Sequence, residues 1–251
     1  MVHIVGAGCG APDLITLRGS RLIGEADVII YAGSLVNPEL LKGAKECCSV
    51  YDSAKMTLEE MTETISQAEK DGKTTVRLHS GDPSLYGAIG EEMRELDRLG
   101  IEYDITPGVS SFSGAAAALK TEYTLPDVSQ TVIITRAAGK TPVPEKEDLR
   151  SLASHGATMV LFLSTGLLKK VTEELIAGGY SQDTPAAIVY KASWDDQKVC
   201  RCTVADLEET ARKNGITKTA LITVGAFLDS DFARSKLYDP GFATEFREAS
   251  N

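Results

Sequence analysis

The sequence predicts an α/β protein with two domains, and three observations support this class. Short β-branched apolar runs alternate with longer segments of helical periodicity, as in parallel strands joined by crossover helices. Glycine-rich turns directly follow several of the predicted strands. The alternation is interrupted between residues 112 and 130 and then resumes. We therefore expect an α/β domain with a mainly parallel sheet over residues 1–112, and an α/β domain with a mixed sheet over residues 113–251.

The elements of the first domain follow from apolar runs and their periodicity. The helix over residues 57–71 has the clearest pattern, because Leu58, Met61, Ile65 and Ala68 recur every three or four positions. Thr57 and Glu60 have the spacing of a capping box at its start. Strands are predicted at residues 3–5, 27–31, 74–78 and 102–106, and further helices at residues 14–24 and 84–99.

The second domain begins with a predicted small-residue helix at residues 114–119. A polar connection at residues 121–130, which contains Pro126, follows this helix, and the alternation of strands and helices then resumes. Residues 199–203 can form an antiparallel ribbon, because a turn at Trp194 precedes them. The remaining strands are predicted at residues 131–135, 158–163, 186–191 and 220–224, and helices at residues 147–154, 165–177 and 203–214.

Composition excludes several classes of partner. The 251 residues carry a formal net charge of −10, which argues against nucleic acid or an anionic membrane surface as a partner. Neither a signal-peptide pattern nor an apolar run of about 20 residues is visible, so we expect a cytoplasmic protein without membrane spans. The five cysteines lack the spacing of zinc ligands, and we expect no metal site.

The first glycine turn, GAGCGAPD over residues 6–13, follows the first strand. Gly6, Gly8 and Ala11 loosely fit the spacing of a dinucleotide-binding fingerprint. Pro12 follows the glycines at once, and no acid stands after the second strand to bind a ribose hydroxyl, which argues against NAD. An NAD-dependent oxidoreductase remains an alternative, as does a turn that only packs strand and helix closely.

The second turn, HSGDPSLYG over residues 79–87, places an acid at the end of a predicted parallel strand. Pro83 suits the first turn of a helix, with Asp82 as its N-cap. A carboxylate at this edge of an α/β sheet is equally suited to a ribose hydroxyl or a cationic ligand. We favour the ligand-binding role of Asp82.

The third turn, TPGVSSF over residues 106–112, precedes an alanine-rich helix. Gly108 allows close backbone approach, and Ser110 and Ser111 can cap the helix or donate to a ligand. The three turns are expected to line one edge of the sheet. Neither a phosphate-binding P-loop motif nor the nucleophile elbow of a hydrolase is present.

Taken together, these segments resemble the tetrapyrrole methylases, the class III S-adenosylmethionine-dependent methyltransferases. The matching segments are VGAGCGAP and LITLRG near the N-terminus, LHSGDPSLYG at residues 78–87 and TPGVSSF at residues 106–112. Further segments are similar to the family members of corrin-ring biosynthesis: YAGSLV, DSAKMTL, TRAAGKTPVPE and YKASWD. Cys9 departs from the family pattern, which usually has proline there.

The resemblance implies a homodimer whose two-domain subunits bind S-adenosylmethionine in a cleft between the domains. By matching position, the implied cofactor contacts of the first domain are Pro12, Ser80, Gly81, Asp82, Ser110 and Ser111, with Tyr86 as a neighbour of the cofactor. Those of the second domain are Leu163, Ala192 and Ala220. No catalytic residue is assigned, because positioning and desolvation can supply much of the rate with a sulfonium donor. His79, Tyr86 and Tyr123 are possible bases.

The implied substrate is a small tetrapyrrole with many carboxylates. Arg136 and Lys140 lie in a 17-residue window, 128–144, that contains no acid, and Lys55 and Lys191 lie in other matched segments. Arginine suits bidentate carboxylate binding and lysine provides a point charge, so Lys55, Arg136 and Lys140 are the candidate substrate contacts, with Lys191 as a further one. The alternatives are a sister methylase acting on uroporphyrinogen III, another precorrin or a diphthine precursor, and a noncatalytic tetrapyrrole-binding protein.

Overall fold

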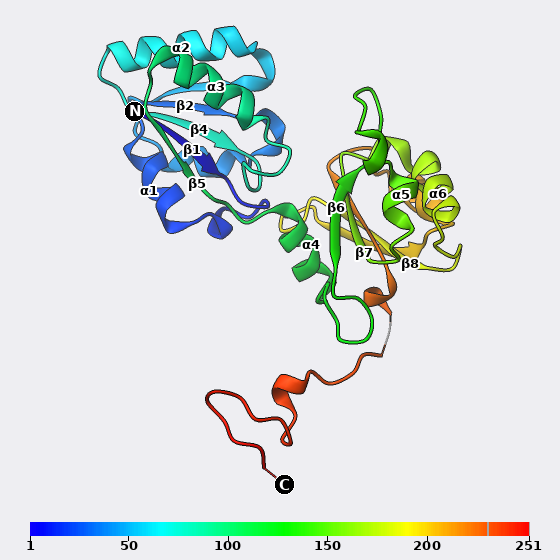
Figure 1. Ribbon diagram of the computed structural model, residues 1–251. Coiled ribbons are helices and arrows are strands. Elements are labelled where there is room, and N and C mark those ends of the chain that lie inside the picture. Colours follow the sequence, from blue (N-terminus) through cyan, green and yellow to red (C-terminus); the bar gives the residue numbers. More distant parts are fainter. Residues whose placement is uncertain (230, 251) are drawn as a thin grey trace. The chain divides into compact units, whose positions relative to one another are not determined.

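The computed structural model describes residues 1–229 and 231–250, which form two compact units (Figure 1). Unit 1 comprises Met1–Ala115 and Lys191–Gln197, and unit 2 comprises Ala116–Tyr190 and Lys198–Asn251. Each unit contains one five-stranded sheet. The predicted division after residue 112 stays a prediction, and it did not anticipate that the segment Lys191–Gln197 packs within unit 1.

The sheet of unit 1 is entirely parallel, in the order β3-β2-β4-β1-β5. Its strands are β1 (Val2–Gly6), β2 (Val28–Tyr31), β3 (Ser49–Asp52), β4 (Thr75–His79) and β5 (Tyr103–Thr106). The prediction missed β3, an exposed edge strand without a β-branched run. Because β4, β1 and β5 are neighbours, the three glycine turns that follow them emerge at one edge of the sheet.

Helices cover both faces of this sheet (Figure 1). Helix α1 (Leu17–Glu25) packs on one face through Leu22 and Ile23, and the cluster there includes Leu78 of β4. Helices α2 (Leu58–Lys70) and α3 (Ile89–Leu99) lie on the other face, where Ile65 and Leu96 are buried. Since successive residues of a strand point to opposite faces, Arg77 and His79 of β4 project toward α2 and α3.

The sheet of unit 2 is mixed, as predicted, in the order β6-β7-β10-β8-β9. Only the pair of β6 and β7 is parallel, and β9 is the predicted antiparallel ribbon beside β8. The strands are β6 (Val132–Arg136), β7 (Thr158–Phe162), β8 (Pro185–Tyr190), β9 (Lys198–Thr203) and β10 (Ala220–Val224), and the helices are α5 (Leu149–Ala153), α6 (Leu168–Ala177) and α7 (Leu207–Lys213). Helix α4 (Ser111–Leu119) spans the division between the units.

Two helix starts in unit 1 differ from the prediction. The helix expected from residue 84 begins only at Ile89, because Tyr86 and Ala88 adopt left-handed backbone conformations with φ of 57° and 55°. Asp82 is therefore not a helix N-cap, and that expectation is wrong. Helix α1 begins at Leu17 and follows a 3-10 turn at Pro12–Leu14. The capping box of Thr57 and Glu60 is confirmed.

None of the helices in residues 1–229 and 231–250 has the length and apolar character needed to cross a lipid bilayer. Within the same residues, His, Cys, Asp and Glu side chains form no cluster of three that could hold a metal ion.

Candidate cofactor site

Three loops meet at the carboxyl ends of β1, β4 and β5, and the first two are joined by backbone hydrogen bonds. Ala7 donates its N–H to the carbonyl of His79 at 2.7 Å. Gly8 and Gly81 exchange two N–H···O bonds of 3.2 and 2.9 Å, and so form a short antiparallel bridge. The predicted convergence of the glycine turns is therefore present within unit 1.

Only glycine fits at the centre of this loop assembly. A Cβ on Gly6 would lie 2.6 Å from Cα of Gly108 and 2.7 Å from the carbonyl oxygen of Gly81. A Cβ on Gly108 would lie 2.1 Å from that same oxygen. Gly81 also has a φ of +62°, a conformation that side chains disfavour. These glycines let three backbones approach closely and leave their N–H and carbonyl groups near one point.

Asp82 ties the second loop to the third. Its Oδ2 accepts from the N–H of Gly108 at 2.9 Å, and its Oδ1 accepts from the N–H of Ser84 at 2.9 Å and from the Ser84 hydroxyl. Burial raises the pKa of this carboxyl, but the hydrogen bonds from Ser84 and Gly108 outweigh that effect, so its pKa lies below the ordinary value. Asp82 is thus held ionised and in one orientation.

The first loop is covered by the segment Lys191–Gln197, which stands apart from it in the sequence. The Trp194 ring lies so close to Gly10 that a Cβ there would be 2.2 Å from Cδ1 of the ring. The Ser193 hydroxyl accepts from the N–H of Ala11 at 2.9 Å and lies 3.4 Å from the Cys9 sulfur. The Asn37 amide also donates to the Gly10 carbonyl at 3.0 Å.

The predicted cofactor residues fall into both units. Unit 1 contains eight of them: Pro12, Ser80, Gly81, Asp82, Tyr86, Ser110, Ser111 and Ala192. Ala192 had been expected from the second domain, but it packs against Gly114 and its carbonyl lies beside Gly10. Tyr86 is 45% exposed, whereas Ser110 is buried at the start of α4.

Leu163 and Ala220 belong to unit 2. Leu163 directly follows β7, has a left-handed φ of 51° and is 69% exposed, an unfavourable combination for an isolated leucine. Ala220 begins β10, and its carbonyl accepts from the Thr165 hydroxyl at 3.1 Å, close in sequence to Leu163. An exposed apolar side chain in a constrained backbone suits contact with a ligand.

The candidate substrate residues are divided between the two units. Arg136 ends β6, and its guanidinium donates to the carbonyl oxygens of Pro142 at 2.6 Å and Thr141 at 3.2 Å, so it folds the following loop back on itself. Lys140 is exposed on that loop. Lys55 belongs to unit 1, is 82% exposed and lines a surface hollow of about 940 Å³ beside β3 and α2. The structure does not bring Lys55 to the loop assembly.

Two of the possible bases, Tyr123 and His79, are buried. Tyr123 is buried, its ring contacts Phe227 edge-on with centroids 5.2 Å apart, and burial raises its pKa well above the ordinary value. His79 is buried against Glu92 of α3. Lys191, a further substrate candidate, pairs with Asp196 at 2.7 Å and lies 5.1 Å from the Trp194 ring centroid.

Sequence reasoning missed two features of this site. Arg77, His79 and Glu92 form a buried polar network directly beneath the second loop. The available signal was the position of Arg77 and His79 two residues apart in an otherwise apolar strand. The packing of Trp194 on Gly10 had no local signal, because the two residues are far apart in the chain.

Comparison with known proteins identifies the family. A family model described as tetrapyrrole (corrin/porphyrin) methylases matches residues 1–208. A cobalt-precorrin-4 C(11)-methyltransferase of Methanocaldococcus jannaschii is 55% identical over 249 residues, which cover 99% of this chain and 96% of the relative. These names are those of methyltransferases and not of oxidoreductases, and they agree with the resemblance seen in the sequence.

Solved structures agree with the sequence relatives. The X-ray structure of a cobalt precorrin-4 methyltransferase, a cobalamin biosynthetic enzyme, aligns with a TM-score of 0.89 and 51% identity over 91% of this chain and 96% of that one. A uroporphyrin-III C-methyltransferase from Thermus thermophilus, complexed with S-adenyl homocysteine, aligns with a TM-score of 0.75 and 27% identity over 91% and 93% of the two chains. The predicted α/β fold is confirmed, and the chain belongs to the tetrapyrrole (corrin/porphyrin) methylases.

Proposed function

We propose that this chain is an S-adenosylmethionine-dependent methyltransferase that methylates C11 of cobalt-precorrin-4 in cobalamin biosynthesis. One observation carries the proposal: the 55% identity to a cobalt-precorrin-4 C(11)-methyltransferase extends over 99% of this chain. Further support comes from the segment TRAAGKTPVPE, which is similar to corrin-ring methylases: its Arg136 ends β6 and its Lys140 follows in the next loop.

The loop assembly of unit 1 has the properties that such a cofactor requires. Gly6 and Gly108 let the three loops pack backbone against backbone at this edge, because a Cβ on either would lie 2.6 Å or less from a backbone atom of another loop. In the part of the chain that the structure describes, the buried hydroxyl of Thr106 lacks a hydrogen-bond partner, directly before Pro107 and Gly108. An unpartnered buried hydroxyl is costly, and a polar ligand at this edge of the sheet can offset that cost.

We propose that the residues predicted from the sequence bind the cofactor. The ionised Asp82 is an acceptor suited to a ribose hydroxyl, because its oxygens retain lone pairs beyond the bonds to Ser84 and Gly108. Ser80, Ser110 and Ser111 supply further polar groups, and Pro12, Tyr86 and Ala192 supply apolar surface. From unit 2, Leu163 and Ala220 would contact the cofactor with apolar groups.

The main requirement on the protein is positioning, because the methyl donor is already activated. S-adenosylmethionine, when bound, supplies a methyl group already activated on a sulfonium. The protein then has to hold the substrate carbon in line with that methyl and exclude water. The buried surroundings of His79 and Tyr123 agree with a mechanism that assigns neither of them as a base.

Basic side chains would bind the carboxylates of the tetrapyrrole. Arg136 is the strongest candidate, since a guanidinium has more donors than its bonds to the 137–142 loop use. Lys140 lies on the loop that Arg136 holds, and Lys55 remains a weaker candidate because it lies beside β3. The resemblance also implies a homodimer, which sedimentation of the purified protein tests.

The experiment is an incubation with S-adenosylmethionine and one tetrapyrrole at a time, followed by mass spectrometry. We expect one added methyl on cobalt-precorrin-4, located at C11 by NMR of the product. Metal-free precorrin-4 and uroporphyrinogen III serve as the competing substrates. Faster methylation of uroporphyrinogen III would overturn the substrate assignment, and the absence of transfer to all three would overturn the proposed activity.

A further inference from the structure

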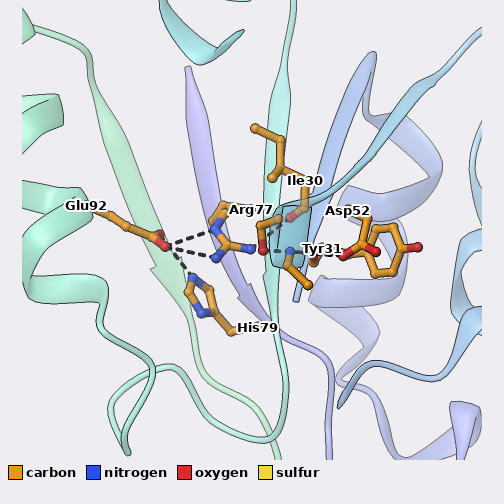
Figure 2. A network of polar contacts seen from close by, with 8 residues as sticks. Ile30, Tyr31, Asp52, Arg77, His79 and Glu92 are labelled. Carbon is orange, nitrogen blue, oxygen red and sulfur yellow. Dashed lines mark hydrogen bonds and ion pairs between the residues drawn. The ribbon is translucent and has the colours of Figure 1, made fainter. Parts of the chain in front are cut away.

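A buried polar network connects the two ends of the second cofactor loop. Oε1 of Glu92, in α3, accepts a hydrogen bond from Nε of Arg77 at 3.0 Å. Nη2 of Arg77 lies 2.9 Å from the same oxygen. The other oxygen, Oε2, accepts from Nε2 of His79 at 3.1 Å. Figure 2 shows both β4 side chains converging on this one carboxylate. Arg77 further donates to the carbonyl of Ile30 in β2 at 3.2 Å.

All three side chains are almost completely enclosed, with side-chain exposures of 8% for Arg77, 4% for His79 and 8% for Glu92. Burial raises the pKa of the Glu92 carboxyl, but the bonds from His79 and Arg77 outweigh this and lower its pKa below the ordinary value. Glu92 is therefore ionised, balances the charge of Arg77, and makes Nε2 of His79 the donor.

The network lies where β4 and α3 flank the connection at residues 80–88. His79 is the last residue of β4, and Glu92 lies in the first turns of α3, so the network joins the two stems of the connection at residues 80–88. That connection contains Ser80, Gly81, Asp82 and Tyr86, all proposed cofactor contacts. The backbone carbonyl of His79 also accepts from Ala7 of the first loop, so its position affects two loops.

The connection is unfavourable by itself and needs to be held. Tyr86 and Ala88 are non-glycine residues in left-handed conformations, which persist only where the surroundings impose them. A Cβ on Gly87 would lie 2.3 Å from the Pro83 carbonyl oxygen, so the turn between them is tight. A buried ion pair contributes little net stability compared with apolar packing, whereas its directional bonds define one geometry.

We propose that Arg77, His79 and Glu92 are positioning residues that hold the stems of the 80–88 connection and thereby order the cofactor loop before the cofactor binds. This inference rests on the proposed function of the loop assembly. Ordering a loop in advance removes part of the entropy cost of binding. The ligand-free protein should therefore already protect the backbone amides of residues 80–88.

The test compares two substitutions of His79. His79→Leu removes the donor to Glu92 and leaves the pair of Arg77 and Glu92 in place. His79→Gln can place an amide N–H where Nε2 lies and should restore the bond. Three measurements are made on each: hydrogen exchange of residues 80–88 without ligand, the Kd of S-adenosylhomocysteine by calorimetry, and the Tm. Ile65→Ala in α2 is the matched control, because it destabilises the same face of the sheet and does not contact the loop.

For His79→Leu we expect exchange in residues 80–88 to accelerate about tenfold and the Kd to weaken about tenfold, the loss of one bond to a charged group. His79→Gln should recover both quantities, and Ile65→Ala should lower the Tm without changing either. If His79→Leu does not fold, His79→Asn takes its place, since its shorter side chain does not reach Glu92. Equal effects of His79→Leu and Ile65→Ala on exchange and Kd would overturn the inference.

The design separates this inference from the proposed function. A wild-type protein that binds no S-adenosylhomocysteine overturns the cofactor assignment, and with it the positioning role. A wild-type protein that binds, while exchange in residues 80–88 and the Kd are unchanged in His79→Leu, leaves the proposed function in place and overturns only the positioning role.

Discussion

Gly108 lies against two other loops at once and shows how single atoms determine this site. Its Cα position leaves no room for a side chain, since a Cβ would be 2.1 Å from the Gly81 carbonyl oxygen and 2.8 Å from Cα of Gly6. All of these neighbours are backbone atoms, which cannot rotate away as a side chain can. The close approach of the three loops therefore depends on the absence of one methyl group.

Gly108→Ala should separate the loops and weaken the binding of the proposed cofactor. We expect a loss of about 1–3 kcal/mol in the free energy of unfolding, the usual range for overpacking, and at least about a tenfold weaker Kd for S-adenosylhomocysteine. Urea unfolding and calorimetry measure the two quantities. Gly90→Ala is the matched control, because no atom lies within 4 Å of a Cβ there and alanine favours the α3 helix. Unchanged binding in Gly108→Ala would contradict the assignment of this loop.

Asp82 provides a prediction of pH dependence. Because its hydrogen bonds from Ser84 and Gly108 lower its pKa in the folded protein, its stabilising contribution is complete above the ordinary carboxyl pKa of about 4. That contribution is lost as the pH falls through the lowered folded value. We expect Asp82→Asn to reduce the free energy of unfolding by about 1 kcal/mol at neutral pH, a small effect because the carboxylate is partly exposed.

Urea unfolding from about pH 7 down to about pH 3 tests this sign, since the ordinary Asp pKa of about 4 lies in that range. The difference between the wild-type protein and Asp82→Asn should shrink as the wild-type carboxyl becomes protonated. A difference that stays constant over this range would mean that the hydrogen bonds of Asp82 do not depend on its charge.

At the scale of elements, local patterns predicted most strands and the convergence of the glycine turns. The strand from Ala220 to Val224 matches its prediction at both ends, because a buried apolar run is a strong local signal. The predicted start of α3 was wrong. Asp82 and Pro83 are residue types that favour a helix start, but Tyr86 and Ala88 adopt left-handed conformations imposed by tertiary contacts, and these conformations prevent a helix there. The packing of Lys191–Gln197 on the first loop was not predictable from local sequence, because it depends on contacts between distant residues.

This last segment allows a direct measurement of the first loop. Trp194 is the single tryptophan of the chain and lies against Gly10. We expect S-adenosylhomocysteine to change the tryptophan fluorescence along a titration curve with the Kd found by calorimetry. Trp194→Phe should remove the fluorescence signal, because it removes the fluorophore. It should weaken the Kd by no more than about threefold, because the smaller phenylalanine ring loses only part of the apolar contact. If calorimetry detects binding but the tryptophan fluorescence does not change, the ligand binds away from this loop.

At the scale of the whole molecule, charge is unevenly distributed along the chain. Residues 1–112 contain 10 basic and 18 acidic residues, a net charge of −8, whereas residues 113–251 have 16 and 18, a net charge of −2. The window 128–144 around Arg136 and Lys140 contains no acid. The net charge of −10 would repel the proposed carboxylate-rich substrate at long range, whereas we expect this window to attract it at short range.

Ionic strength distinguishes which of these two fields controls the binding of the tetrapyrrole. Salt screens interactions beyond about 30 Å at 0.01 M and beyond about 10 Å at 0.1 M, so the long-range repulsion is the first to be removed. If the local basic window controls binding, the KM for cobalt-precorrin-4 should rise as salt increases from about 0.1 M to about 1 M, because direct carboxylate contacts weaken. Lys140→Gln should reduce this salt dependence, whereas Lys169→Gln, a substitution of a lysine on α6 outside the window, should not. A KM that falls steadily with salt would mean that the net charge dominates, and that Arg136 and Lys140 are not the substrate contacts.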